Sequence, residues 1–168
     1  VRKALAMLEV QKLVERRAGS GTYVSFQAGA NQHDIAEKTS PLELIEVRAA
    51  IEPQMARLAV LHASAVDLER LQGLVNELQA AEEDADADRY AAVDEQFHLA
   101  IAAATSNPLL VWLYEQINVI RTHALWAEMR NKIITQENMR IYNKQHLAVV
   151  RAIQSRDAAA AASRLPAH

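Results

Sequence analysis

Helix-start signals recur along most of this chain and limit what it can fold into. A capping side chain, a proline, or both precede five apolar stretches with a helical period. These starts are Ser40-Pro41-Leu42-Glu43, Ser64-Ala65-Val66-Asp67, Asn107-Pro108, Thr135 and Asp157. Together with the periodicity they predict helices over about 40–63, 64–81, 88–105, 108–131 and 135–155, and from 157 onward.

The composition agrees with a mainly α fold. Alanine and leucine carry much of the 51% hydrophobic content, whereas aromatic residues make up only 5%. The absence of cysteine excludes disulfides and thiolate metal sites. The longest uncharged apolar run, over 99–114, contains Asn107-Pro108 and is too short for a bilayer. We therefore expect a cytoplasmic protein without a membrane partner.

The first 26 residues differ from the rest. An amphipathic helix is predicted over 1–14, and two β-prone runs at 13–17 and 22–26 flank a glycine-containing turn. A helix followed by such a hairpin is typical of the second half of a winged helix, although it also occurs in other α+β proteins. The chain begins without Met inside a helical pattern, so we expect it to be part of a longer protein.

Charge separates this segment from the remainder. The first 24 residues hold five basic and two acidic residues, and the rest holds 13 basic and 19 acidic ones. A basic end on an acidic body predicts that the first segment meets a polyanion. The DNA-binding candidates are Arg2, Lys3, Arg16, Arg17, Gly19, Ser20, Gly21 and Thr22. The basic side chains supply charge, and the glycines allow close backbone approach.

A carboxylate and three histidines suggest a metal site. Asp94 and His98 are four residues apart in one predicted helix, so their side chains share a face. His146 and His168 lie in two later segments. Imidazole nitrogen and carboxylate oxygen are the usual ligands of divalent transition metals. The alternative is an ordinary solvated or hydrogen-bonded Asp–His pair.

The N-terminal segment resembles the end of the DNA-binding domain of GntR-family transcription regulators. The resemblance is carried by Val1-Arg2, Ala4-Leu5, Leu8-Glu9, Leu13-Val14 and Gly19-Ser20-Gly21-Thr22-Tyr23-Val24. Lys12 departs from the glycine usual at the helix end in that family. The resemblance implies that residues 1–26 are the C-terminal part of a winged helix-turn-helix whose first helices precede this sequence.

The remainder resembles the helical FCD ligand-binding domain of the FadR-type branch of that family. The similar stretches are 44–59, 94–110 and 145–162. The resemblance implies a linker over 27–39 and an antiparallel bundle of six to seven helices over 40–168. It also implies the metal ligands Asp94, His98, His146 and His168. Pro166 is a departure, because it breaks the last helix just before His168.

Two further residues are candidates for effector binding. By the resemblance Arg48 faces the effector pocket, where a guanidinium suits a carboxylate. The alternative is a helix pair between Arg48 and Glu52, one turn apart. Asn143, close before His146, either lines the same pocket or is a surface amide.

The resulting prediction is a dimeric, DNA-binding transcription regulator, repressor or activator, and not an enzyme. Its partners are operator DNA and a small carboxylate effector, and its cofactor is a divalent metal, zinc first, with nickel, manganese or iron as alternatives. The rival interpretation is a di-iron carboxylate enzyme, which needs two Glu-x-x-His motifs. Glu95 to His98 supplies one, but Asn143 stands where the second needs glutamate. A third interpretation is a purely structural bundle without metal.

Overall fold

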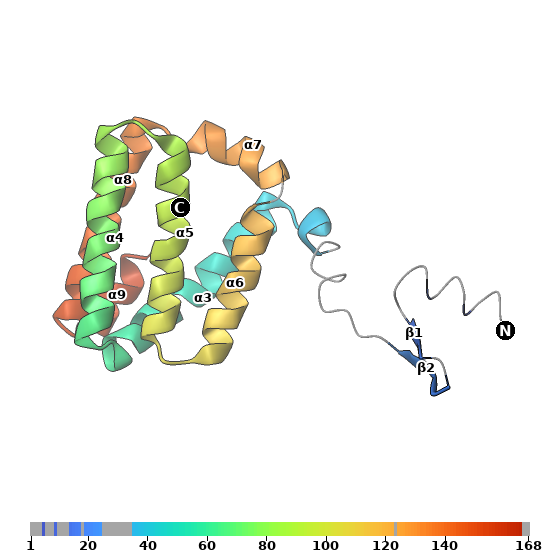
Figure 1. Cartoon of the computed structure of the whole chain (residues 1–168). Coiled ribbons are helices and arrows are strands. Elements are labelled where there is room, and N and C mark those ends of the chain that lie inside the picture. The colour runs from blue at the N-terminus through green and yellow to red at the C-terminus, as the bar shows by residue number, and fades with distance from the viewer. Residues whose placement is uncertain are drawn as a thin grey trace. The chain divides into compact units, whose positions relative to one another are not determined.

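The computed structural model describes residues 5, 9, 14–17, 19–24, 35–122 and 124–165. The chain divides into two compact units, 1–38 and 39–168. In the first unit, β1 (Val14–Arg17) pairs antiparallel with β2 (Gly21–Val24), and Arg17 lies opposite Gly21 (Figure 1). Gly19 and Gly21 have φ values of 76° and 118°, which favour glycine. The predicted glycine-turned hairpin is therefore confirmed.

The structure describes only some of the residues on which the other predictions for this unit rest. The helix predicted over 1–14 is described at Leu5 and Glu9, both helical, and otherwise lies outside the described residues. Within the predicted linker, residues 35–38 form a short helical turn, and residues 27–34 lie outside the described part.

The second unit is an antiparallel helical bundle (Figure 1). Its helices are α3 (Pro41–His62), α4 (Ala65–Glu83), α5 (Ala87–Ala104), α6 (Pro108–Arg121), α7 (Ala124–Ile133), α8 (Gln136–Gln154) and α9 (Ala158–Ser163). Helix α4 packs against α5 and α8, and α3 contacts α5, α8 and α9. The predicted mainly α bundle is confirmed.

The helices begin where the capping signals predict. The Ser40 side chain accepts a hydrogen bond from the Glu43 N–H, and the Glu43 carboxylate accepts one from the Ser40 N–H. Ser64 and Asp67 form the same reciprocal box at the start of α4. Single caps start four further helices, at Asp86, Asn107, Thr135 and Asp157, of which Asp86 was not among the predicted starts.

One predicted helix is wrong in extent. The segment predicted as a single helix over 108–131 forms two helices, because α6 ends at Arg121. The Thr122 hydroxyl donates to the Val119 carbonyl at 2.7 Å, so it competes with the backbone ladder at this point. Helix α7 then crosses one end of the bundle (Figure 1). It places Trp126 in the interior, whereas Trp112 on α6 is 54% exposed.

The core is built from aliphatic and small side chains with a few large ones. Met55, Leu71, Phe97, Ile101 and Ile153 are fully buried. Buried alanines on α3 and α9 allow these two helices to approach closely. No helix among the described residues is long and apolar enough to span a membrane.

Three helix ends use a left-handed residue that is not glycine. Ala85, Ser106 and Arg156 have φ values of 53°, 56° and 60°. At the end of α4 the N–H of Ala85 donates to the Glu82 carbonyl and that of Asp86 to the Ala81 carbonyl. This is the Schellman pattern, which favours glycine at the left-handed position.

We therefore expect Ala85→Gly to stabilise the bundle by about 1 kcal/mol, because glycine removes the steric penalty of a left-handed alanine. Urea unfolding measures the difference. Ala80→Gly, inside regular α4, is the control and should lower stability by about 1 kcal/mol. Equal destabilisation by both changes would contradict the strain at Ala85.

Candidate metal centre and adjoining cavity

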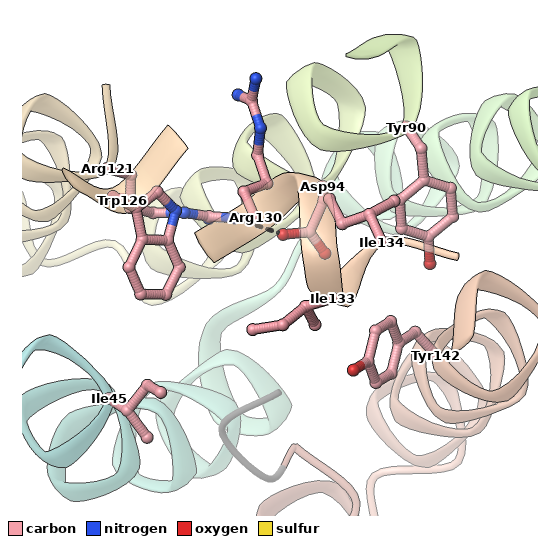
Figure 2. A pocket seen from close by; sticks show the side chains of 9 residues that line it. All are labelled: Ile45, Tyr90, Asp94, Arg121, Trp126, Arg130, Ile133, Ile134 and Tyr142. Atoms are coloured by element: carbon pink, nitrogen blue, oxygen red, sulfur yellow. Dashed lines mark hydrogen bonds and ion pairs between the residues drawn. The ribbon is translucent and has the colours of Figure 1, made fainter. Parts of the chain in front are cut away.

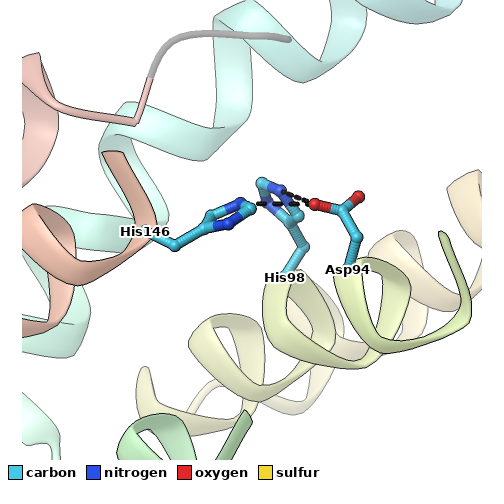
Figure 3. Close-up of side chains that lie close together, drawn as sticks. All are labelled: Asp94, His98 and His146. Atoms are coloured by element: carbon cyan, nitrogen blue, oxygen red, sulfur yellow. Dashed lines mark ion pairs between the residues drawn. The ribbon is translucent and has the colours of Figure 1, made fainter. Parts of the chain in front are cut away.

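Asp94, His98 and His146 meet in the interior of the bundle (Figure 3). Asp94 and His98 project from α5, and His146 projects from α8. Both histidines are fully buried and Asp94 is 4% exposed. Asp94 Oδ1 lies 3.6 Å from His98 Nε2 and 3.2 Å from His146 Nε2. The sequence prediction that these three side chains converge is therefore confirmed.

The donor set fits a divalent transition metal. One ligand atom from each residue lies within 4.8 Å of the others, so modest side-chain adjustment brings all three to one ion. Two imidazole nitrogens and one carboxylate oxygen suit zinc or its neighbours in the first transition row. Direct burial of an aspartate and two histidines otherwise carries a large desolvation penalty.

The surroundings of His98 fix which nitrogen carries its proton. His98 Nε2 lies 3.2 Å from Arg48 Nη2. A guanidinium can only donate, so Nε2 accepts and the ring is neutral. The proton then sits on Nδ1, which lies 3.5 Å from Glu52 Oε1. Burial lowers the pKa of His98, although the nearby carboxylates of Glu52 and Asp94 oppose this effect. This is the tautomer that a metal ligand needs.

On the α3 side of the cluster, several side chains contact Glu52. Its Oε1 accepts hydrogen bonds from Arg48 Nε at 2.6 Å and from the Tyr114 hydroxyl at 2.8 Å. Burial alone would raise the pKa of Glu52, but neighbouring His98 and Arg48 hold it below its ordinary value. The Arg48–Glu52 pair expected as one alternative does form, and it is fully buried. Arg48 also reaches His98, so the pair and a role at the site coexist.

Arg121 holds the other side of Asp94. Its Nη2 donates to Asp94 Oδ2 at 2.7 Å, while Oδ1 faces the two histidines. Neither Arg121 nor Tyr114 was predicted from the sequence as a site residue. Each is a polar residue at the end of an otherwise apolar stretch. The sequence alone does not show whether such a residue is buried or exposed.

A cavity of about 50 Å³ adjoins the cluster beneath α7 (Figure 2). It is lined by Ile45, Tyr90, Asp94, Arg121, Trp126, Arg130, Ile133, Ile134 and Tyr142. Asp94 belongs to both the ligand cluster and the cavity wall. The arrangement can therefore hold an ion and a small organic molecule side by side.

Asn143 is buried, and both polar atoms of its side chain form hydrogen bonds. Its Oδ1 accepts from the Tyr90 hydroxyl at 3.1 Å, and its Nδ2 donates to Glu82 Oε2 at 2.7 Å and to the Leu78 carbonyl. It is not a surface amide, and it does not line the cavity. The bonds tie α8 to α4 and α5, behind the site.

The remaining candidates lie in different parts of the chain. Arg2, Lys3 and His168 lie outside the described residues. Arg16 and Arg17 occupy β1, where only the backbone is described. The turn residues Gly19, Ser20, Gly21 and Thr22 are exposed, as a contact surface requires.

We expect Glu52→Gln to destabilise the bundle by about 3 kcal/mol, because it leaves the Arg48 guanidinium buried without its counter-charge. Chemical denaturation measures the loss. Glu46→Gln, at an exposed position of the same helix, should change stability by less than about 0.5 kcal/mol. Similar effects from both variants would argue against a buried ion pair.

Comparisons with known proteins agree with this geometry. The FCD domain family matches residues 43–168. The Uxu operon regulator of Haemophilus influenzae is 35% identical over 164 residues, which cover 94% of this chain and 60% of that protein. The Uxu operon transcriptional regulator of Escherichia coli is 32% identical over 168 residues, covering 96% of this chain and 65% of the relative. The chain thus spans less than two thirds of either relative.

A solved structure shares the fold. Escherichia coli McbR/YncC superposes with a TM-score of 0.64 at 24% identity, covering 98% of this chain and 72% of that one. The family match and the named regulators give no support to the di-iron enzyme interpretation. The chain therefore belongs to the GntR family of transcription regulators, in the branch with an FCD domain, and is not an enzyme.

Proposed function

We propose that the helical unit is the sensor of a DNA-binding transcription regulator, and that it detects a small organic acid beside a bound divalent metal. The observation that carries this proposal is the buried Asp94 oxygen that faces the Nε2 atoms of His98 and His146. When bound, the ion supplies a Lewis-acidic centre with open positions for ligand oxygens. Zinc is the first choice, with nickel, manganese or iron as alternatives, and His168 is the proposed fourth ligand.

Metal and effector binding are linked through Arg48. His98 Nε2 has one lone pair, and in this structure it faces Arg48 Nη2. Once Nε2 is committed to an ion, that guanidinium N–H becomes available to another acceptor. A carboxylate at the ion's open positions would meet this N–H. The acid would therefore bind the metal-loaded form in preference to the metal-free form.

The DNA-binding role rests on the first segment and on the relatives. The exposed turn Gly19–Thr22 and the basic residues Arg2, Lys3, Arg16 and Arg17 form the proposed contact surface. The Uxu regulators are named for control of an operon, which supports an operator DNA partner for this chain. Operators read by winged helices present paired half-sites, so we propose a homodimer in the cytoplasm.

We expect His98→Ala to remove stoichiometric metal from the purified protein, because it deletes one of three converging ligands. Elemental analysis measures the metal content, and ligand distances near 2.0–2.2 Å are expected for zinc. His62→Ala, at an exposed histidine of α3, is the matched control and should retain the metal. Undiminished metal in His98→Ala, or no metal in the parent protein, would contradict the assignment of these residues as metal ligands.

We expect Arg2→Ala to weaken specific operator binding by about 1–3 kcal/mol in the protein with its complete DNA-binding domain. Binding measured across a salt series separates a phosphate contact, which lowers the salt dependence, from a base contact. Arg151→Ala, on the exposed face of α8, is the control and should leave affinity unchanged. Unchanged affinity for Arg2→Ala at every salt concentration would exclude this contact.

A further inference from the structure

One residue pair of α3 contacts both ring nitrogens of His98. Arg48 Nη2 lies 3.2 Å from Nε2, and Glu52 Oε1 lies 3.5 Å from Nδ1. Arg48 and Glu52 are one turn apart on α3, whereas His98 belongs to α5. All three side chains are fully buried, so water does not compete for these contacts. Helix α3 therefore acts on the nitrogen that faces Asp94 and also on the other nitrogen of the same ring.

The two oxygens of Glu52 are used unequally. Oε1 accepts hydrogen bonds from Arg48 Nε at 2.6 Å and from the Tyr114 hydroxyl at 2.8 Å. Oε2 is buried and has no hydrogen-bond partner within the part of the chain that the structure describes. A buried acceptor without a donor is unfavourable, and the Nδ1 atom of His98 lies beside this carboxylate. A small rotation of the carboxylate would offer Oε2 to the Nδ1–H group.

Metal binding would strengthen the contact with Glu52 and oppose the contact with Arg48. An ion on Nε2 makes Nδ1–H a stronger donor, and a carboxylate that accepts this proton makes Nε2 a stronger ligand. The present separation of 3.5 Å leaves room to shorten toward the roughly 2.7–3.2 Å of an N–H···O bond. Arg48 has the opposite effect, because its guanidinium contacts the Nε2 lone pair and carries positive charge.

We propose that Glu52 is a positioning residue for the metal, and that its carboxylate accepts the Nδ1–H of His98 when Nε2 binds the ion. This inference rests on the proposed metal binding and adds a residue outside the ligand set that controls the affinity. It also assigns opposite roles to the two members of one ion pair, since Glu52 favours metal binding and Arg48 opposes it. A purely structural pair would not do so, because loss of either member leaves the other charge buried alone.

The test measures the zinc affinity of the purified protein by competition with a chromogenic chelator. Glu52→Gln keeps the size of the side chain but removes its charge, and should weaken zinc binding by about 10- to 100-fold. Arg48→Met breaks the same pair from the other side and should bind zinc at least as tightly as the parent. Both variants lose stability for the same reason, so a difference in their zinc affinity does not arise from unfolding.

Two control variants lie on the exposed face of the same helix. Glu46→Gln and Arg57→Met make the same chemical changes at exposed positions of α3. Both should bind zinc with the parental affinity. They therefore separate the effect of contact with His98 from the effect of a changed net charge.

A second measurement does not depend on the folding of a variant. Nitrogen-15 NMR of the histidine-labelled parent protein reports which ring nitrogen of His98 carries the proton, and His98→Ala assigns the signals in the metal-free state. Nδ1 should carry the proton both without and with zinc. Its proton resonance should move downfield on zinc loading, because the N–H···O contact shortens, and this shift should be smaller in Glu52→Gln.

Each failure has its own meaning. Parental zinc affinity of Glu52→Gln, or equal losses in Glu52→Gln and Arg48→Met, would overturn the positioning role and leave the metal site intact. A proton on Nε2 of His98 in the zinc-loaded parent would overturn it as well. Failure of the parent protein to bind zinc or another first-row divalent ion would overturn both this inference and the proposed sensor.

Discussion

The buried carboxylate of Asp94 is the group on which the interior of the bundle depends. One oxygen faces two histidines from α5 and α8, and the other accepts from Arg121 on α6. On the α3 side, Glu52 balances Arg48 in the same way. The buried cluster therefore holds two cations and two anions. A divalent ion would make it strongly positive, and a carboxylate ligand would then restore part of the balance. This charge argument explains why an acid is the expected effector of such a pocket.

Buried ion pairs add little to the stability of a helical bundle, because removing the charges from water has a large free-energy cost. Apolar side chains of similar size stabilise a bundle as well or better. Here the Arg48–Glu52 pair has a second effect, because both residues contact His98 and set its tautomer. Glu52 faces Nδ1 of His98, and Arg48 faces Nε2. These two contacts hold a neutral imidazole whose Nε2 lone pair faces Arg48. Without them, burial alone would keep His98 neutral but would not choose between its two tautomers.

Much of the bundle could be predicted from the sequence because its helix starts are local features. The boxes at Ser40–Glu43 and Ser64–Asp67 need only neighbouring residues, and the one-turn spacing of Asp94 and His98 follows from helix geometry. The break after Arg121 could not be predicted, because the apolar period continues past it. Among the described residues its local sign is the bond of the Thr122 hydroxyl to the Val119 carbonyl, which the sequence does not show. The partners Arg121, Tyr114 and Glu52 were missed as site residues for a related reason. Their roles depend on long-range contacts with Asp94 and among themselves, which no local pattern encodes.

The division of α6 from α7 also has a functional consequence. A single straight helix over 108–131 would carry Trp126 away from the cluster along the axis of α6. The turn at Thr122 instead lets α7 cross the end of the bundle, and Trp126 then lies beside Arg121 over the cavity. Ile133 and Ile134 close the same wall from the far end of α7. The wall of the cavity therefore includes both ends of one short helix. Among the described residues, α7 has fewer contacts with the rest of the bundle than α4 and α5 have, so this helix can respond to occupancy of the cavity as a unit.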